Sequence, residues 1–336
     1  MDNPQDWTTV RTALEAALKD GNAEPPVTIR TKDAVWRHAR AVEDALDGEY
    51  DWTQPAVRLA EAEMAAFVRR LTAAPADAPV TVTSGGTESL FLALHAAREW
   101  AKIARPEARA PTLLMPTSGH AAATKAARYL GLAERRVPLG SDGRADAAAM
   151  EHAIDANVVA ILGSVPSDSR GLCDDMSALG RLAERANAWL HADACIGGFL
   201  VPFLKAQGAA LPAWNFDVPA VRSISLDAHK YGYAPTGVST LILRNPDDLA
   251  HQRFDFEDWD GPPKSQAAFA GTRSAAPLAG AWAAMRLIGW DGYARRAAHV
   301  HAMARRLAER LRATNRARVW SEVETGGVHF GVDGLA

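Results

Sequence analysis

The fold of this 336-residue chain is indicated by the segment Ser223-Ile-Ser-Leu-Asp-Ala-His-Lys-Tyr-Gly-Tyr-Ala-Pro-Thr-Gly237. The mostly apolar run 220–226 predicts a short strand, and the aromatic, Gly and Pro residues after it do not favour a helix. Lys230 is therefore expected at the edge of a buried sheet. Desolvation there disfavours its ammonium form and favours an amine that attacks aldehydes. Considered alone, Lys230 also fits a surface lysine that follows a strand.

Strands and helices alternate upstream of this segment. Strands are predicted at 80–83, 112–115, 136–138, 158–163 and 188–192, and helices at 88–100, 121–130, 145–153 and 175–187. A further strand is expected at 238–243, after the lysine segment. This order predicts an α/β fold in which helices cover a mainly parallel sheet. Ligands of such sheets bind at the carboxyl ends of the strands.

The flanking regions contain more helices than strands. Helices are predicted at 8–20, 54–71, 277–288 and 293–314, an irregular loop at 245–264, and short strands at 318–323 and 327–332. The arginines of helix 293–314 surround an apolar stripe, which favours a solvated helix that bridges to another domain over a nucleic-acid binder. We expect an N-terminal part at 1–53, a large ligand-binding α/β domain at 54–288, and the start of a small domain at 289–336.

The composition argues against several classes of partner. A net charge of -3 and an isoelectric point near 6.4 give no reason to expect nucleic acid or an anionic membrane surface. No signal peptide and no apolar run of membrane-spanning length are visible, so a soluble, cytoplasmic protein is expected. The two cysteines, Cys173 and Cys195, lack metal-ligand spacing and are expected to be free thiols, with no metal site.

A candidate anion cradle lies at the first predicted strand-to-helix junction, Thr83-Ser-Gly-Gly-Thr-Glu-Ser89. Gly85 and Gly86 permit close approach of a ligand, and the free N–H groups of the helix start suit a phosphate. Thr87 adds a hydroxyl. The same residues also make an ordinary turn and N-cap.

Two further candidates follow other strands. Asp193 ends an apolar strand, where it fits either a carboxylate that holds a protonated pyridine nitrogen or one that bonds to the backbone. His120 begins a predicted helix, where it fits either a helix cap or an imidazole stacked on an aromatic cofactor. Together with the cradle and Lys230, these residues supply what pyridoxal 5′-phosphate requires: a phosphate site, a stacking group, an acid for the ring nitrogen and an amine.

Three strings carry a resemblance to a known family: residues 83–89, Asp193-Ala-Cys-Ile-Gly-Gly-Phe-Leu-Val-Pro-Phe203 and residues 223–235. They resemble the sphingosine-1-phosphate lyase branch of the group II pyridoxal-phosphate-dependent decarboxylases, over about residues 49–288. The resemblance implies a type I, aspartate aminotransferase-like fold with a truncated C-terminal small domain. It also implies a homodimer with active sites at the subunit interface.

The resemblance assigns roles to the candidate residues. Lys230 is expected to form the internal aldimine (a Schiff base), Asp193 to pair with the pyridine nitrogen and His120 to stack on the ring. The phosphate and its surroundings are expected to contact Gly85, Gly86, Thr87 and His229. The loop Ala270-Gly-Thr-Arg273 resembles the family's Gly-Ser-Arg loop, so Thr272 is expected to reach the neighbouring subunit's cofactor. An ordinary loop before a helix is the alternative there.

The implied activity is that of a carbon–carbon lyase of the aldehyde-lyase type, acting on an amino substrate through an external aldimine. The bond broken at Cα depends on the substrate's orientation, so an L-amino-acid α-decarboxylase, a β-elimination and an aldol addition stay open. A non-catalytic truncated paralogue or partner subunit is the non-enzyme alternative. Tyr231 and Tyr233 fit either a general acid or aromatic packing.

The chain departs from the family in several places. Thr236 replaces a second lysine that is associated with the phosphorylated substrate, and Tyr50–Gln54 replaces an Asn-x-Leu-His motif. Pro166-Ser-Asp-Ser-Arg-Gly171 stands where the family usually has an aromatic-Pro-His-Gly turn. A threonine cannot supply the missing charge, so we expect a substrate other than sphingosine 1-phosphate.

Overall fold

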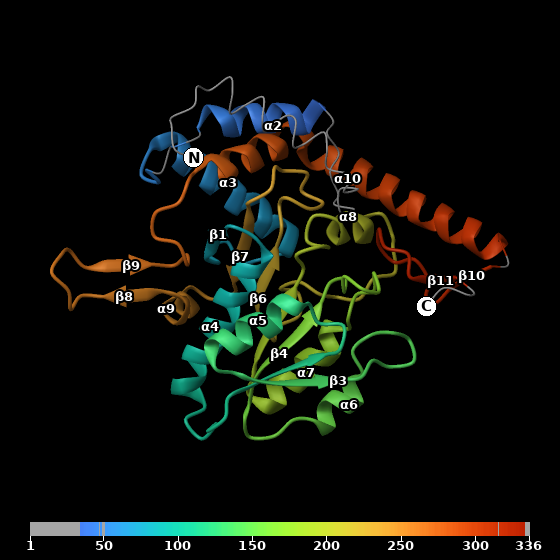
Figure 1. Cartoon of the computed structure of the whole chain (residues 1–336), viewed down its shortest axis with the longest axis horizontal. Coiled ribbons are helices and arrows are strands. Elements are labelled where there is room, and N and C mark those ends of the chain that lie inside the picture. The colour runs from blue at the N-terminus through green and yellow to red at the C-terminus, as the bar shows by residue number, and fades with distance from the viewer. Residues whose placement is uncertain (1–33, 47, 49–50, 315, 333–336) are drawn as a thin grey trace, which may run out of the picture. The chain divides into compact units, whose positions relative to one another are not determined.

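A seven-stranded sheet lies at the centre of the computed structural model, which describes residues 34–46, 48, 51–314 and 316–332 (Figure 1). The strands are β1 (Val80–Thr83), β2 (Thr112–Pro116), β3 (Ala133–Val137), β4 (Val158–Ser164), β5 (Trp189–Asp193), β6 (Val221–Leu226) and β7 (Ser239–Leu243). Their order is β1-β7-β6-β5-β4-β2-β3. Neighbours from β6 to β3 are parallel, and β7 is antiparallel to both of its neighbours. The predicted α/β class with a mainly parallel sheet is confirmed.

The two faces of the sheet pack against different helices because successive strand residues point to opposite sides. Leu113 and Met115 of β2 join a core cluster with α4 (Gly86–Ala104) and α5 (Ala121–Leu130). Leu114, between them, joins the larger cluster, which contains residues of α3 (Pro55–Thr72), α7 (Met176–Ala186) and α8 (Val201–Ala206). Strand β2 is therefore apolar on both faces, as is usual in a helix-covered parallel sheet.

The remaining elements lie around this sheet. They are α2 (Ala34–Ala45), α6 (Ala147–His152), η1 (Pro246–Asp248), α9 (Leu249–Gln252), β8 (Phe254–Phe256), β9 (Lys264–Gln266), α10 (Ala276–Ala313), β10 (Ala317–Val319) and β11 (Phe330–Val332). The irregular loop predicted at 245–264 is wrong in part, because it contains η1, α9 and an antiparallel β8–β9 hairpin that projects from the sheet (Figure 1).

The two helices predicted after residue 276 form one element, α10. Gly289 interrupts it with φ 64 and ψ 170, a left-handed conformation that glycine adopts without steric cost. The sequence therefore predicted the break near Gly289 but not that the two helices form one continuous element.

The helix predicted at 8–20 lies outside the described residues, and the three-part domain division stays a prediction. Within the described part of the chain, no helix is both long and apolar enough to cross a membrane.

The strand directions bring six loops to one edge of the sheet. Because β2, β3, β4, β5 and β6 are parallel, their carboxyl ends share that edge. β1 runs in the same direction as β6, since each is antiparallel to β7. Gly85 follows β1, His120 follows β2, Asp193 ends β5 and Lys230 follows β6. The topology alone therefore places the main candidate residues at one edge.

Candidate active site

A cavity of about 370 Å³ opens at this edge of the sheet. Seven of the eight predicted site residues line it, namely Gly85, Gly86, Thr87, His120, Asp193, His229 and Lys230. Its volume lies at the lower end of the range that is usual for small-molecule sites. The sequence therefore identified residues from four separate segments that the fold brings together.

Thr272 is the exception, because it is an exposed residue of the loop before α10 and does not line this cavity. The neighbouring Arg273 holds the loop to its own chain. Its guanidinium lies 3.7 Å from the ring centroid of Trp52, whose Nε1 donates a hydrogen bond of 3.1 Å to the Arg273 carbonyl. The expected role of Thr272 at a neighbouring subunit stays a prediction.

The cradle is the N-terminus of α4, a helix of 19 residues that begins at Gly86. Its cap residue Gly85 has no side chain to bond the first turn, so that helix end is open to an anion. A Cβ built on Gly86 would lie 2.7 Å from Cys195 Sγ and 2.9 Å from Asp227 Oδ1. Only glycine fits there without a shift of these neighbours, which explains the second glycine of the motif.

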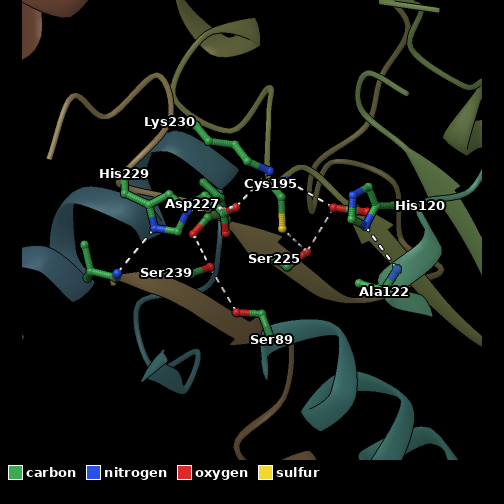
Figure 2. Close-up of polar contacts among 12 residues, drawn as sticks. Ser89, His120, Ala122, Cys195, Ser225, Asp227, His229, Lys230 and Ser239 are labelled. Carbon is green, nitrogen blue, oxygen red and sulfur yellow. Dashed lines mark hydrogen bonds and ion pairs between the residues drawn. The ribbon is translucent and has the colours of Figure 1, made fainter. Parts of the chain in front are cut away.

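A chain of buried hydroxyl groups holds this helix end against the sheet (Figure 2). Ser89 Oγ on α4 lies 2.7 Å from Thr83 Oγ1 and 3.0 Å from Ser239 Oγ, and Ser239 donates to the Leu226 carbonyl at 2.8 Å. These residues belong to β1, α4, β7 and β6. Buried hydrogen bonds therefore fix the cradle and the end of β6 relative to each other.

Lys230 forms an ion pair with Asp227, with 2.9 Å between Nζ and Oδ2 (Figure 2). Burial is the largest single influence on the lysine pKa and lowers it, but the surrounding groups, Asp227 first among them, raise it above its usual value. Desolvation therefore acts on Lys230 as expected, but an acidic partner outweighs it and the pKa of the lysine is raised. This partner was not expected from the sequence.

Asp227 is that partner, and it lies almost wholly inside the protein, with 3% of its surface exposed. Its Oδ1 makes no hydrogen bond to any of the described residues. His229 Nε2 lies 3.6 Å from Oδ2, and His229 Nδ1 accepts a hydrogen bond of 3.3 Å from the Val238 amide. The signal that identified Asp193, an acid at the end of an apolar strand, would also have found Asp227.

Asp193 both bonds to the backbone and lines the cavity, so the two interpretations of this residue are compatible. Its Oδ1 accepts a hydrogen bond of 3.2 Å from the Cys195 amide and lies 3.4 Å from Ser225 Oγ, on the neighbouring strand β6. Cys195 Sγ also contacts Ser225 Oγ at 3.2 Å. The carboxylate is thereby held in one orientation at the cavity wall.

Behind Asp193, the same faces of β5 and β6 continue as a buried polar row. His191 Nδ1 lies 2.8 Å from Ser223 Oγ and Nε2 lies 3.2 Å from Ser225 Oγ, while Trp189 Nε1 donates to Ser223 Oγ at 2.8 Å. Burial lowers the pKa of His191 to about 4, although Asp193 opposes this effect. His191 is therefore neutral near pH 7 and acts as a hydrogen-bonding support for Ser225 and, through it, Asp193.

The position of His120 is compatible with both interpretations, a helix cap and a group that stacks on the cofactor ring. His120 is the N-cap of α5, where Nδ1 accepts a hydrogen bond of 3.1 Å from the Ala122 amide, and its ring lines the cavity (Figure 2). In a neutral ring with Nδ1 as acceptor, the proton is on Nε2. The cap fixes the ring, which is what a stacking role needs, and stacking stays a prediction.

Tyr231 and Tyr233 belong to the hydrophobic core, as the packing interpretation expects. Burial raises the pKa of Tyr231 to about 12. Neither tyrosine lines the cavity. The structure thus gives no support to either as the general acid.

The residues of the cavity fit pyridoxal 5′-phosphate. The open N-terminus of α4 suits its phosphate, the buried Asp193 carboxylate suits a protonated ring nitrogen, and the Lys230 amine suits its aldehyde. The glycine at position 86 leaves the space that a side chain would fill.

Comparison with known proteins agrees with a site for pyridoxal 5′-phosphate. Residues 48–333 match the model of the pyridoxal-dependent decarboxylase conserved domain. A sphingosine-1-phosphate lyase of Arabidopsis thaliana is 38% identical over 254 residues, which are 76% of this chain and 46% of that protein. A probable L-tyrosine/L-aspartate decarboxylase of Methanothermobacter thermautotrophicus is 34% identical over 70% of this chain and 63% of its own length.

A solved structure gives the same result. The sphingosine-1-phosphate lyase of Burkholderia pseudomallei superimposes with a TM-score of 0.91 at 29% identity, covering 99% of this chain and 80% of that one. The chain spans about half the length of the curated sphingosine-1-phosphate lyases that it matches. The predicted fold, the resemblance to the lyase branch and the cofactor are confirmed at the level of the family. The chain belongs to the pyridoxal-dependent decarboxylase family.

Proposed function

We propose that this chain contains the cofactor site of a carbon–carbon lyase of the aldehyde-lyase type, which acts on a small amino substrate. The observation that carries the proposal is the convergence of Lys230, Asp193, His120 and the Gly85–Thr87 cradle on one cavity. The similarity to sphingosine-1-phosphate lyases supports the lyase over other reactions of the family. A homodimer that completes the site is part of this proposal.

The residues of this chain have separate tasks in the proposed reaction. Pyridoxal 5′-phosphate, when bound, supplies an electron sink for the bond that breaks at the substrate's Cα. Asp193 would keep a proton on the ring nitrogen, His120 would form one wall against the ring, and the α4 N-terminus would hold the phosphate. Lys230 would hold the cofactor through its amine, which would also be available to exchange a proton with the substrate.

The substrate is proposed to differ from sphingosine 1-phosphate. Thr236, in the place of the lysine associated with that substrate, is exposed to solvent and carries no charge. A threonine hydroxyl cannot replace an ammonium group as the partner of a phosphate. Turnover of sphingosine 1-phosphate at a rate equal to that of the best small amino substrate would contradict this part of the proposal.

An L-amino-acid α-decarboxylase is the second candidate, because a probable L-tyrosine/L-aspartate decarboxylase is nearly as similar to this chain as the lyases are. Product analysis distinguishes the two, since a lyase releases an aldehyde and a decarboxylase releases CO₂. The assay uses a panel of amino acids and amino alcohols with the full chain.

The site itself is tested with Lys230→Ala, and Lys102→Ala, which changes an exposed lysine of α4, is the control. We expect the purified protein to show the visible absorption of bound cofactor, and Lys230→Ala to lose it together with roughly 10³-fold or more of the activity. Lys102→Ala should retain both. Retention of full activity by Lys230→Ala refutes the proposed site.

A further inference from the structure

The loop 165–174 after β4 forms one wall of the cavity, through Pro166 and Asp168. β4 lies between β5, which ends at Asp193, and β2, which precedes His120. The loop therefore occupies the sheet edge between the two residues that we place around the cofactor ring. It is also the loop in which the sequence departs from the aromatic-Pro-His-Gly turn of the family.

Asp168 differs from the other acids that line the cavity, which are Glu88, Asp193 and Asp227. Glu88 accepts hydrogen bonds from the Ser84 amide and hydroxyl at 2.7 and 2.6 Å. Asp193 and Asp227 have the partners described above. Asp168 is exposed and makes no hydrogen bond or ion pair with any residue in the described part of the chain. Its carboxylate is therefore open to a ligand.

Hydrogen bonds within the loop fix the backbone on both sides of Asp168. The Ser167 amide donates to the Leu172 carbonyl at 2.9 Å, and the Gly171 amide donates to the Ser167 carbonyl at 2.9 Å. At the base, Asp174 Oδ2 accepts a hydrogen bond of 2.8 Å from the Ser164 amide. The side chain thus projects from a closed and internally bonded turn.

The segment between β10 and β11 fixes the outer side of the same loop. Thr325 Oγ1 donates to the Gly171 carbonyl at 2.9 Å, and Glu324 accepts a hydrogen bond of 3.0 Å from the Cys173 amide. A Cβ built on Gly171 would lie 3.1 Å from the Cα of Gly327, so the two backbones are in close contact. Asp168 is therefore presented by a loop that is held from both sides.

The positive charge nearest in sequence is directed elsewhere. Arg170 lines a separate cavity of about 640 Å³, where its Nη1 lies 3.2 Å from the ring of His329. The basic groups that line the 370 Å³ cavity in the described chain are Lys230, His120 and His229, and each has a proposed role toward the cofactor. In this cavity, the described chain therefore has no remaining basic group that could bind an anionic group of a substrate. It does have one unpaired carboxylate, Asp168, that could bind a cationic group.

We propose that Asp168 is a specificity-determining residue, which selects amino substrates that carry a second, positively charged group. The inference rests on the proposed function, because it assumes that the substrate reacts at the cofactor in the same cavity. The carboxylate accepts a charge-assisted hydrogen bond from the second ammonium or guanidinium group. An anionic group at that end of the substrate is repelled.

The test is a titration of the cofactor-loaded full chain with L-lysine, L-norleucine and L-glutamate, and with the amino alcohols lysinol and norleucinol. Binding is followed by the change in the cofactor's visible absorption, which needs no turnover. We expect L-lysine or lysinol to bind about tenfold more tightly than its neutral counterpart. Asp168→Asn should remove this preference, and Asp168→Lys should favour L-glutamate over L-lysine.

Asp77→Asn, which changes an exposed acid in the loop before β1, at the opposite end of that strand from the cradle, is the control and should keep the wild-type preference. A wild-type protein that distinguishes neither L-lysine from L-norleucine nor lysinol from norleucinol, or that responds to neither lysine nor lysinol, overturns the inference. So does an Asp168→Asn protein that retains the preference. Loss of cofactor absorption from the wild-type protein would instead contradict the proposed function, so the two failures are distinguishable.

Discussion

Two loops at the same edge of the sheet are built in opposite ways. The turn after β6 encloses Asp227, of which 3% is exposed, beneath Lys230 and against the glycine cradle. The loop after β4 is bonded along both flanks but leaves Asp168 exposed. In the first loop, Asp227 contacts Lys230 and lies against Gly86, so a substitution there would disturb its neighbours. In the second loop, Asp168 is exposed, so it can be substituted without a change in the packing of the core. We infer that the loop after β6 fixes the cofactor and the loop after β4 selects the substrate.

Gly86→Ala is expected to have the largest effect on the cofactor side. The added Cβ would meet Cys195 Sγ at 2.7 Å and Asp227 Oδ1 at 2.9 Å, so the helix end or the turn after β6 has to shift. Overpacking of this kind costs about 1–3 kcal/mol of folding stability. Because the shift would also displace the N–H groups that suit the phosphate, we expect the affinity for pyridoxal 5′-phosphate to fall by up to roughly 100-fold. Absorbance titration of the cofactor-free protein measures this affinity.

Gly85→Ala is the matched control, because its Cβ would meet only His229 Cε1, at an ordinary distance of 3.5 Å. The backbone of Gly85 is extended, so alanine is tolerated there. We expect a clearly smaller loss of affinity than for Gly86→Ala. Equal losses in the two variants would show that the tight contact at position 86 is not what fixes the cradle.

The pH dependence of stability tests how completely the polar row on β5 and β6 behind Asp193 is buried. His191 has a pKa of about 4 in the folded protein against a usual value of 6.5, so protonation favours the unfolded chain. Its contribution to stability is complete above about pH 6.5 and is lost as the pH falls toward 4. Between pH 7 and 5 this amounts to about 2 kcal/mol.

Urea unfolding of the cofactor-free protein at several pH values measures this loss. His191→Gln keeps a hydrogen-bonding side chain but cannot be protonated, so its stability should fall less over the same interval. Identical pH profiles for the two proteins would mean that His191 is accessible to water, contrary to its buried place in the row behind Asp193.

Much of the fold follows from local sequence patterns. Buried parallel strands are short apolar runs between helices, and these were found with errors at their ends; β4, for example, is one residue longer than predicted. Helix α5 has the predicted bounds. The antiparallel direction of β7 was not predicted, because direction depends on how the connection after Lys230 crosses the sheet edge. Helix α2 was missed although its apolar residues recur at helical spacing. The β8–β9 hairpin was missed because its strands have only three residues each, too few for a sequence pattern.

The site was predictable only in part, for a different reason. Lys230, Asp193 and the glycines stand in motifs whose chemistry is readable from residue type and position. Asp227 follows an apolar strand and was within reach of the same reasoning, but its ion pair with Lys230 is a distance that only the folded chain determines. The place of Asp168 in the cavity wall likewise depends on the fold. Thr272 marks the limit of a single chain, because its expected contact involves a second subunit.

The smallest of these effects concerns the Asp227–Lys230 ion pair. Asp227 is the main group that raises the pKa of Lys230 against burial, so Asp227→Asn should lower that pKa. Because the neutral amine attacks an aldehyde, cofactor attachment below the lysine pKa should become faster at a given pH. We expect the rate of attachment to rise about fivefold, which corresponds to about 1 kcal/mol, the upper value for a partly exposed ion pair.

Measuring the rate with both pyridoxal 5′-phosphate and unphosphorylated pyridoxal separates this change from any damage to the phosphate cradle. A profile that is unchanged, or displaced to higher pH, with both aldehydes would mean that Asp227 supports the turn after β6 without controlling the lysine's proton.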